Sequence, residues 1–213
     1  MTKSQIQSSS QKAGGIARTS SREDLILDAA DRLLARYGYK KMTIDDVARE
    51  AGIGKGTVYL HFKSKQDLVL SHIDRIIDRL LEEFDRIVTG DASADEKLRE
   101  MLLLRVLFRF DSVQHYTESI AEVLRDLRTE LLERRKRYFE DEAKIIAKVV
   151  REGQKTGALR LADAPATARA LVAATNSLLP YSLSTAELGR RKDVEQSTRR
   201  IVELLLNGLR AAT

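Results

Sequence analysis

Three glycines and a lysine lie together within residues 52–56, in the run "GIGKG". Backbone amides beside glycine and a lysine ammonium are groups that hold phosphate, so the segment suggests contact with a phosphorylated partner. Two nucleotide-binding patterns nevertheless fail. G-x-x-x-x-G-K-[ST] requires a glycine at Arg49 and a hydroxyl at Gly56, and G-x-G-x-x-G requires a glycine at Thr57. The phosphate therefore does not belong to a nucleotide held by either loop.

The residues before the glycines are helical in period, whereas both nucleotide loops follow a β-strand. Within residues 44–51 the apolar side chains that share one face are Ile44, Val47, Ala48 and Ala51. A short helix, a glycine turn and a second short helix make a helix-turn-helix outline. This outline points to the phosphates of duplex DNA.

The second short helix, residues 54–61, has an unusual outward face. Val58 and Phe62 are four residues apart and are expected to pack inward. The opposite side carries Gly56, Thr57, Tyr59 and Leu60, bordered by Lys55 and His61. Such a face suits DNA, because glycine lets the backbone approach a groove, lysine neutralises phosphate and leucine can contact a thymine methyl. An amphipathic helix packed on a neighbouring element is the alternative.

The net charge of +5 is concentrated in the same part of the chain. Residues 1–65 carry 12 Lys and Arg against 7 Asp and Glu, and the remaining 25 basic and 25 acidic residues cancel. A localised basic segment is expected of a protein that binds a phosphate backbone.

Composition excludes several classes of protein. The chain lacks cysteine, which rules out disulfides and thiolate metal sites. The polar N-terminus does not resemble a signal peptide and no apolar run approaches the length of a membrane span, so we expect a cytoplasmic protein. The three histidines have no metal-ligand spacing and G-x-S-x-G is absent. We therefore predict no metal, no cofactor and no enzymatic activity.

Helix-start signals of the form [ST]-x-x-[DE] recur four times and strand-like alternation is absent, which predicts an all-α fold. Residues 1–20 are expected to form a disordered basic arm, residues 21–66 a helix-turn-helix head, and residues 67–213 an antiparallel helical domain. The expected helices span residues 22–38, 43–51, 54–61, 64–89, 93–110, 113–126, 129–156, 164–185 and 192–212.

Residues 42–69, "MTIDDVAREAGIGKGTVYLHFKSKQDLV", closely resemble the DNA-binding signature of the tetracycline-repressor (TetR) family. That signature is T-x-x-x-I-A-x-x-A-G-[VI]-S-x-G-x-[LIV]-Y-x-[HY]-F-x-[SN]-K-x-x-L, and the resemblance covers about residues 22–72. One departure is Gly54, where the family commonly has Ser or Thr as the cap of the recognition helix. Val47 replaces the usual isoleucine, which a core tolerates.

The resemblance implies a homodimeric, ligand-controlled transcription factor, usually a repressor, that binds palindromic operator DNA. The residues that it places at the DNA are Thr43, Gly54, Lys55, Gly56, Thr57, Tyr59, Leu60, His61 and Lys65. Amides at the helix N-termini near residues 43 and 54 would also point toward phosphate. The alternative function is a small-ligand binding or interaction protein that has kept the helix-turn-helix without operator-specific binding. An enzyme built in the C-terminal part ranks below both.

The C-terminal domain is expected to bind a small, mostly apolar effector and to form the dimer. Candidate ligand residues are Met101, Leu104, Phe108, Tyr116, Ile120, Tyr138, Phe139, Asn176 and Tyr181, with plain core packing as the alternative. By the resemblance, the last two helices pair with their two-fold mates. Candidate interface residues are Leu171, Val172, Leu178, Leu179, Val194, Ile201, Val202, Leu205 and Leu209, with burial inside the chain as the alternative.

Overall fold

The computed structural model describes residues 21–113, 123, 125–160, 162–179 and 189–211. The predicted arm at residues 1–20, most of the predicted helix at 113–126, and the candidate ligand residues Tyr116, Ile120 and Tyr181 lie outside these residues. The helices are α1 (Arg22–Lys41), α2 (Ile44–Ala51), α3 (Lys55–His61), α4 (Lys65–Thr89), α5 (Ala94–Val113), α7 (Arg128–Lys155), α8 (Ala164–Thr175), the 3-10 turn η2 (Asn176–Leu178) and α9 (Arg191–Leu209). The all-α prediction is confirmed. Among the described helices, each is too short or too polar to cross a membrane.

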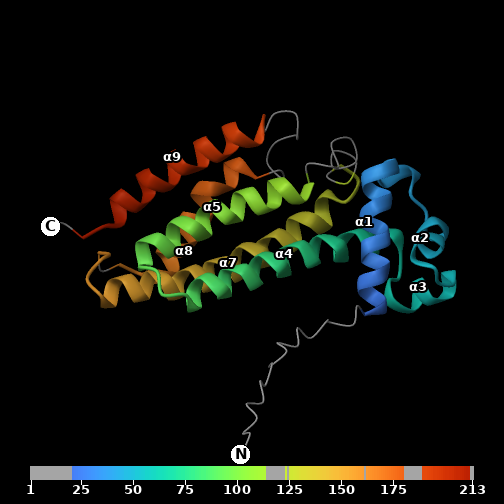
Figure 1. Ribbon diagram of the computed structural model, residues 1–213, viewed down its shortest axis with the longest axis horizontal. Coiled ribbons are helices and arrows are strands. Elements are labelled where there is room, and N and C mark those ends of the chain that lie inside the picture. Colours follow the sequence, from blue (N-terminus) through green and yellow to red (C-terminus); the bar gives the residue numbers. More distant parts are fainter. Residues whose placement is uncertain (1–20, 114–122, 124, 161, 180–188, 212–213) are drawn as a thin grey trace, which may run out of the picture.

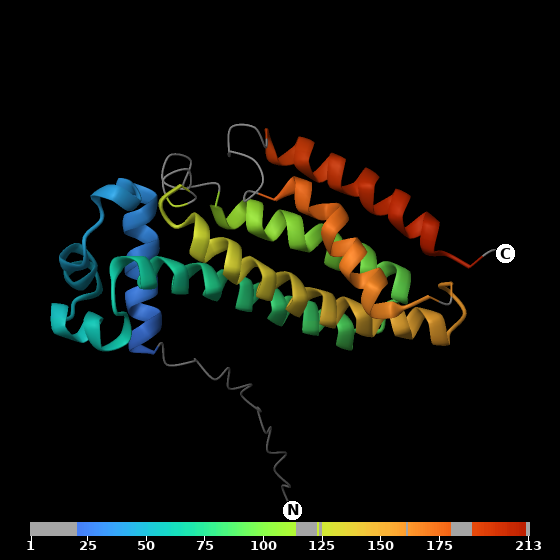
Figure 2. The same cartoon turned by 180° about the vertical axis from the view of Figure 1, so that it is seen from behind.

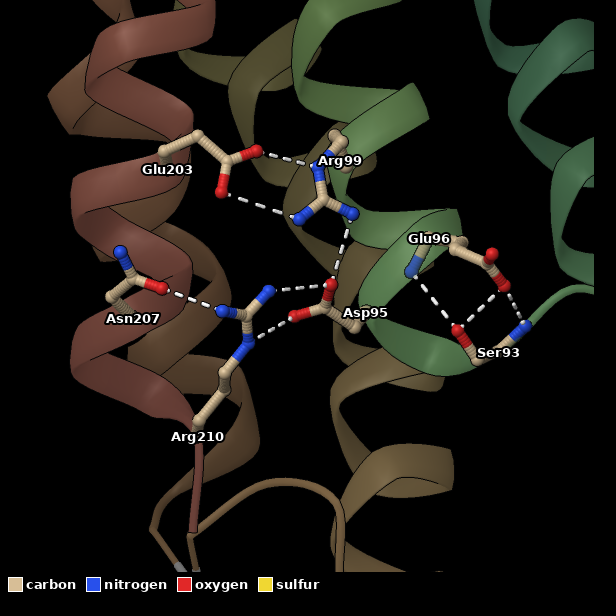
Figure 3. Close-up of polar contacts among 7 residues, drawn as sticks. All are labelled: Ser93, Asp95, Glu96, Arg99, Glu203, Asn207 and Arg210. Atoms are coloured by element: carbon tan, nitrogen blue, oxygen red, sulfur yellow. Dashed lines mark hydrogen bonds and ion pairs between the residues drawn. The ribbon is translucent and has the colours of Figure 1, made fainter. Parts of the chain in front are cut away.

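Hydroxyl side chains start four of these helices, as the sequence signals predict. Ser21 and Thr43 each form a reciprocal capping box with the carboxylate three residues later. The hydroxyl of Ser64 accepts a hydrogen bond from the amide of Asp67, and Ser93 pairs with Glu96 through amide and hydroxyl (Figure 3). Each cap satisfies amides that a helix N-terminus leaves without partners.

Glycines with positive φ set two turns in the N-terminal part. Gly52 ends α2 in the left-handed conformation, with φ 68° and ψ 31°, and turns the chain toward α3. Gly38, with φ 78° and ψ 169°, interrupts α1, which continues for one more turn to Lys41. The predicted stop at Gly38 is thus a break in the helix, which ends three residues later.

The molecule is elongated, with α1, α2 and α3 forming a head at one end (Figures 1 and 2). From this head α4 and α7 run side by side along the bundle in both views, and α9 lies on its outer edge. The core of the head includes Val123, Leu127 and Leu131, from the chain around the start of α7. The predicted domain limit near residue 66 stays a prediction, but the head core draws on residues far beyond it.

The C-terminal core is formed where α4, α5, α7, α8 and α9 meet. Side-chain ion pairs connect the C-terminal end of α9 to the start of α5, as Figure 3 shows. Arg99 bridges Asp95 and Glu203, and Arg210 reaches both oxygens of Asp95 at 3.0 Å. Hydrogen bonds that the two guanidiniums donate to these carboxylates raise the pKa of both arginines, and the network holds α9 in one rotation on the bundle.

Candidate nucleic-acid interface

Helix α3 is fixed to the head by the two side chains that the sequence places inward. Val58 is fully buried and Phe62 is 2% exposed, and both belong to the head core. Leu60 on the opposite side is 84% exposed and Tyr59 is 48% exposed. A leucine so exposed gains nothing from the fold of its own chain, because burial is what makes an apolar side chain stabilising. The face around Leu60 is therefore available to a partner.

Two glycines leave the start of α3 uncovered. A Cβ added to Gly56 would meet no heavy atom within 4 Å, so packing within the chain does not require glycine there. Gly54 is the N-cap residue and supplies no side-chain hydrogen bond to the helix. The N-terminal amides of α3 therefore lack the side-chain acceptor that Ser or Thr would provide.

The two lysines assigned to phosphate differ in their surroundings. Lys55 is exposed and its ammonium donates to the carboxylate of Asp45 at 2.8 Å, which raises the pKa of the lysine. Lys65 is half-buried and its ammonium donates to the carbonyl oxygens of Tyr39 at 3.0 Å and Met42 at 3.2 Å. The same ammonium lies 4.4 Å from the ring centroid of Tyr39.

Lys65 thus caps the last carbonyls of α1, a structural role that its sequence position does not reveal. Its phosphate contact stays a prediction. Thr43 is similarly occupied, because its hydroxyl donates to Asp46 at 2.7 Å and accepts from the Asp46 amide. What Thr43 can offer to DNA is the N-terminus of the helix that it caps.

Most of the described candidate ligand residues of the C-terminal domain lie in or against its core, and their role in ligand binding stays a prediction. Met101 is fully buried in the C-terminal core, and Leu104 and Phe108 are partly buried against it. Tyr138 donates its hydroxyl to Asp74 on α4, whereas the neighbouring Phe139 packs toward α5. Phe139 packs against the same core, and Phe139 and Asn176 both lie beside Arg105, to which Asn176 offers its carbonyl oxygen at 2.8 Å.

Sequence reasoning missed the charged group that these two residues adjoin. Arg105, Arg109 and Glu142 are each at most 1% exposed. Glu142 accepts from Arg105 Nε at 2.6 Å and from Arg109 at 2.5 Å, and Arg105 also donates to the Thr175 hydroxyl. Burial by itself raises the pKa of the Glu142 carboxyl, but the two guanidiniums outweigh this and lower it. The available signal was two arginines, four residues apart, in the otherwise apolar run "MLLLRVLFRF".

Comparison with known proteins identifies both parts of the chain. Residues 26–71 match the model of bacterial regulatory proteins of the tetR family, and residues 94–202 match that of the tetracyclin repressor-like C-terminal domain. The chain belongs to the TetR family. Its members are DNA-binding transcriptional regulators and not enzymes, which confirms the expected family, the regulatory function and the absence of an enzymatic role.

The relatives of this TetR-family chain include regulators of lipid metabolism. The fatty acid metabolism regulator protein of Bacillus subtilis is 25% identical over 186 residues, which cover 86% of this chain and 93% of the relative. A TetR/AcrR-family regulator from Thermobifida fusca is 28% identical, with a TM-score of 0.63 and coverage of 89% and 99%. The regulator FadR from Bacillus subtilis, solved with stearoyl-CoA, shares the fold at 22% identity, a TM-score of 0.63 and coverage of 86% and 97%.

The expected dimer residues of this TetR-family chain differ in how deeply the single chain buries them. Five of the nine lie inside the chain itself, each at most 4% exposed: Leu171, Val172, Leu179, Val194 and Val202. They pack α8 and α9 onto the bundle, so each is a core residue of the single chain, and its place in a two-fold interface stays a prediction. Leu178, Ile201, Leu205 and Leu209 are half-buried and stay predictions. The exposed side chain that the sequence analysis missed is Leu204, at 74%.

Proposed function

We propose that this TetR-family regulator is a homodimeric repressor that binds a palindromic operator and is released from it by a small, mostly apolar molecule. The observation that carries the proposal is the face of α3. Leu60 and Tyr59 are exposed on a helix that Val58 and Phe62 hold rigidly to the head. A rigid element with exposed groups that can contact bases is what reading a DNA groove requires.

The outward surface of α8 and α9 supports a two-fold partner. On α9, Leu204 is exposed beside Ile201 and Gly208, and its neighbour Glu203 is turned toward Arg99 (Figure 3). On α8, the exposed residues at helical spacing are the small side chains Ala166, Ala170 and Ala173, together with Arg169. Small side chains let helices approach closely, and a large apolar residue among them fills the contact. This combination suits a four-helix interface.

Effector control needs a physical connection between the C-terminal domain and the head, and α4 and α7 provide two parallel ones. Asp74 on α4 pairs with Arg134 and Arg137 and accepts from the Tyr138 hydroxyl, all three on α7. Leu127 and Leu131, at the start of α7, belong to the head core. A displacement of α7 caused by an effector would therefore move both α4 and the packing of the head.

The relatives favour an apolar effector. The regulator of fatty acid metabolism aligns along nearly its full length, and the solved FadR carries stearoyl-CoA. A long-chain lipid derivative is consistent with a domain whose helices meet through leucine, isoleucine, valine and phenylalanine.

The test is selection of bound sequences from a pool of random duplexes, followed by sizing of the complexes. A two-fold dimer presents two recognition helices about one DNA turn apart, so we expect a palindromic motif bound by two chains. Recovery of no symmetric motif would contradict the proposal and favour a ligand-binding protein that does not recognise an operator.

A further inference from the structure

The buried charged group between α5 and α7 carries more positive than negative charge. Arg105 and Arg109 are opposed by the single carboxylate of Glu142. Within the described part of the chain, no second carboxylate forms an ion pair with either arginine. Buried charges in proteins are ordinarily paired, because removing an ion from water without a partner is costly. The group is therefore one anion short of balance.

One hydrogen-bond donor of this group is also unused. The Nε of Arg109 lies in a side chain that is only 1% exposed, and it has no hydrogen-bond partner among the residues that the structure describes. The other nitrogens of Arg109 reach the Arg105 carbonyl at 3.0 Å and Glu142. A buried donor left unsatisfied is destabilising, so such groups in native proteins call for an explanation.

The surroundings combine a third positive charge with apolar surface. Phe139 lies near two guanidiniums, with the Arg105 Cζ 5.3 Å and the Arg135 Cζ 4.9 Å from its ring centroid. Arg135 is half-buried and forms no ion pair with a described residue. Phe139 also packs against the apolar cluster that contains Phe110, Leu178 and Leu179. Positive charge and apolar side chains next to each other suit an amphipathic molecule.

We propose that Arg105, Arg109 and Arg135 bind the anionic head group of the effector, and that the effector is an amphipathic carboxylic acid whose apolar chain packs beside Phe139. This inference rests on the proposed function and deepens it, because it assigns the chemical class of the effector and the groups that select it. A carboxylate accepts two parallel hydrogen bonds from a guanidinium, which a neutral alcohol cannot do.

The protonation behaviour of the group agrees with an incomplete set of anions. Burial and the charge of Arg109 lower the pKa of Arg105 to about 10, against the opposing effect of Glu142. Arg105 remains protonated at neutral pH. A second anion at this place would oppose both effects, since it favours the charged form of each arginine.

The experiment compares saturated carboxylic acids of medium and long chain with the primary alcohols of the same length, below their micelle concentrations. Dissociation constants are measured by calorimetry on the full chain without DNA, with Tm as a second readout. We expect at least one acid to bind about tenfold or more tightly than its alcohol, the effect of one charge-assisted hydrogen bond. Equal binding of every acid and its alcohol would overturn the proposal.

Substituted variants test which arginines cause the preference for an acid over its alcohol. Arg109→Met should remove it, and Arg135→Gln, a half-buried position that tolerates change, should reduce it about threefold or more. Arg151→Gln is the matched control, because Arg151 is an exposed arginine elsewhere on α7 and should leave the preference unchanged. If Arg109→Met does not fold, the binding of acid and alcohol to Arg135→Gln decides whether the arginines bind the head group. A preference that survives in every folded variant would place the acid elsewhere and overturn the assignment.

A final arm separates this inference from the proposed function. The acid that binds best is added to the complex of wild-type protein with its selected operator. Release of DNA supports both proposals. Arginine-dependent acid binding without release would keep the acid site and refute effector control. If acids and alcohols release the DNA equally well, effector control would be supported and the acid site would be refuted.

Discussion

At the scale of single residues, Gly56 separates the requirements of folding from those of binding. Nothing in the chain lies within 4 Å of a Cβ placed there, and the residue sits near the start of α3 beside the exposed Tyr59 and Leu60. A helix is normally less stable with glycine than with alanine, so the fold alone would favour alanine. We infer that glycine is retained for close approach to DNA.

Gly56→Ala should therefore stabilise the protein and weaken operator binding. The expected gain in unfolding free energy is about 0.5 kcal/mol, from lower backbone entropy in the unfolded chain. Operator affinity should fall about tenfold or more, since a methyl group would separate α3 from the groove. Urea unfolding and a binding titration measure the two effects. Undiminished affinity would show that α3 does not approach DNA through this residue.

At the scale of elements, the rotation of α9 decides which of its leucines are available. Leu206 and Val202 are buried and Leu204 is 74% exposed, in a rotation of α9 in which the neighbouring Glu203 is held by Arg99. In a two-fold interface Leu204 would occur twice. Burial of two leucines contributes about 3 kcal/mol or more to association.

Leu204→Arg should therefore raise the dimer dissociation constant about a hundredfold or more, with little change in the secondary structure of the chain. Analytical ultracentrifugation over a range of concentrations measures this constant. Leu132→Arg is the control, because Leu132 is also an exposed leucine, at 42%, but lies on α7. If both variants associate like the wild type, the dimer uses another surface or does not form.

At the scale of the whole molecule, regulation requires that the effector distinguish two states of the protein. A ligand that binds both states equally cannot release DNA, however tight its binding. The two parallel helices α4 and α7, joined through Asp74, are the structural means by which the C-terminal domain could favour one position of the head.

Effector and operator should weaken each other's binding by the same factor, because linkage between two binding sites is reciprocal. A factor of about one hundred, near 2.7 kcal/mol, would give clear release of the operator. Titration of the effector with and without operator DNA measures the factor in one direction, and titration of DNA with and without effector measures it in the other. Equal effector affinities in the two titrations would show that ligand binding in the C-terminal domain does not control DNA binding by the head.

The sequence by itself determined the helices of the head, their caps and the outward face of α3. These features depend on neighbouring residues: the hydroxyl at Thr43 and the carboxylate at Asp46, the left-handed turn at Gly52, and the inward pair Val58 and Phe62, four residues apart. Local chemistry and helical period suffice to predict such features. The family followed from the same short segment, because its residue types occur at fixed spacing.

Only the tertiary structure decided which side chains of the C-terminal domain face each other. Arg105 and Glu142 are 37 residues apart, and Arg105 and Asn176 are 71 apart, so no local pattern joins them. The same limit explains why the sequence did not show that Val194 and Val202 are buried inside the chain, or that Lys65 caps the last carbonyls of α1. An apolar stripe or a charge in a sequence predicts that a side chain needs a partner, but the packing of distant segments determines which partner it has.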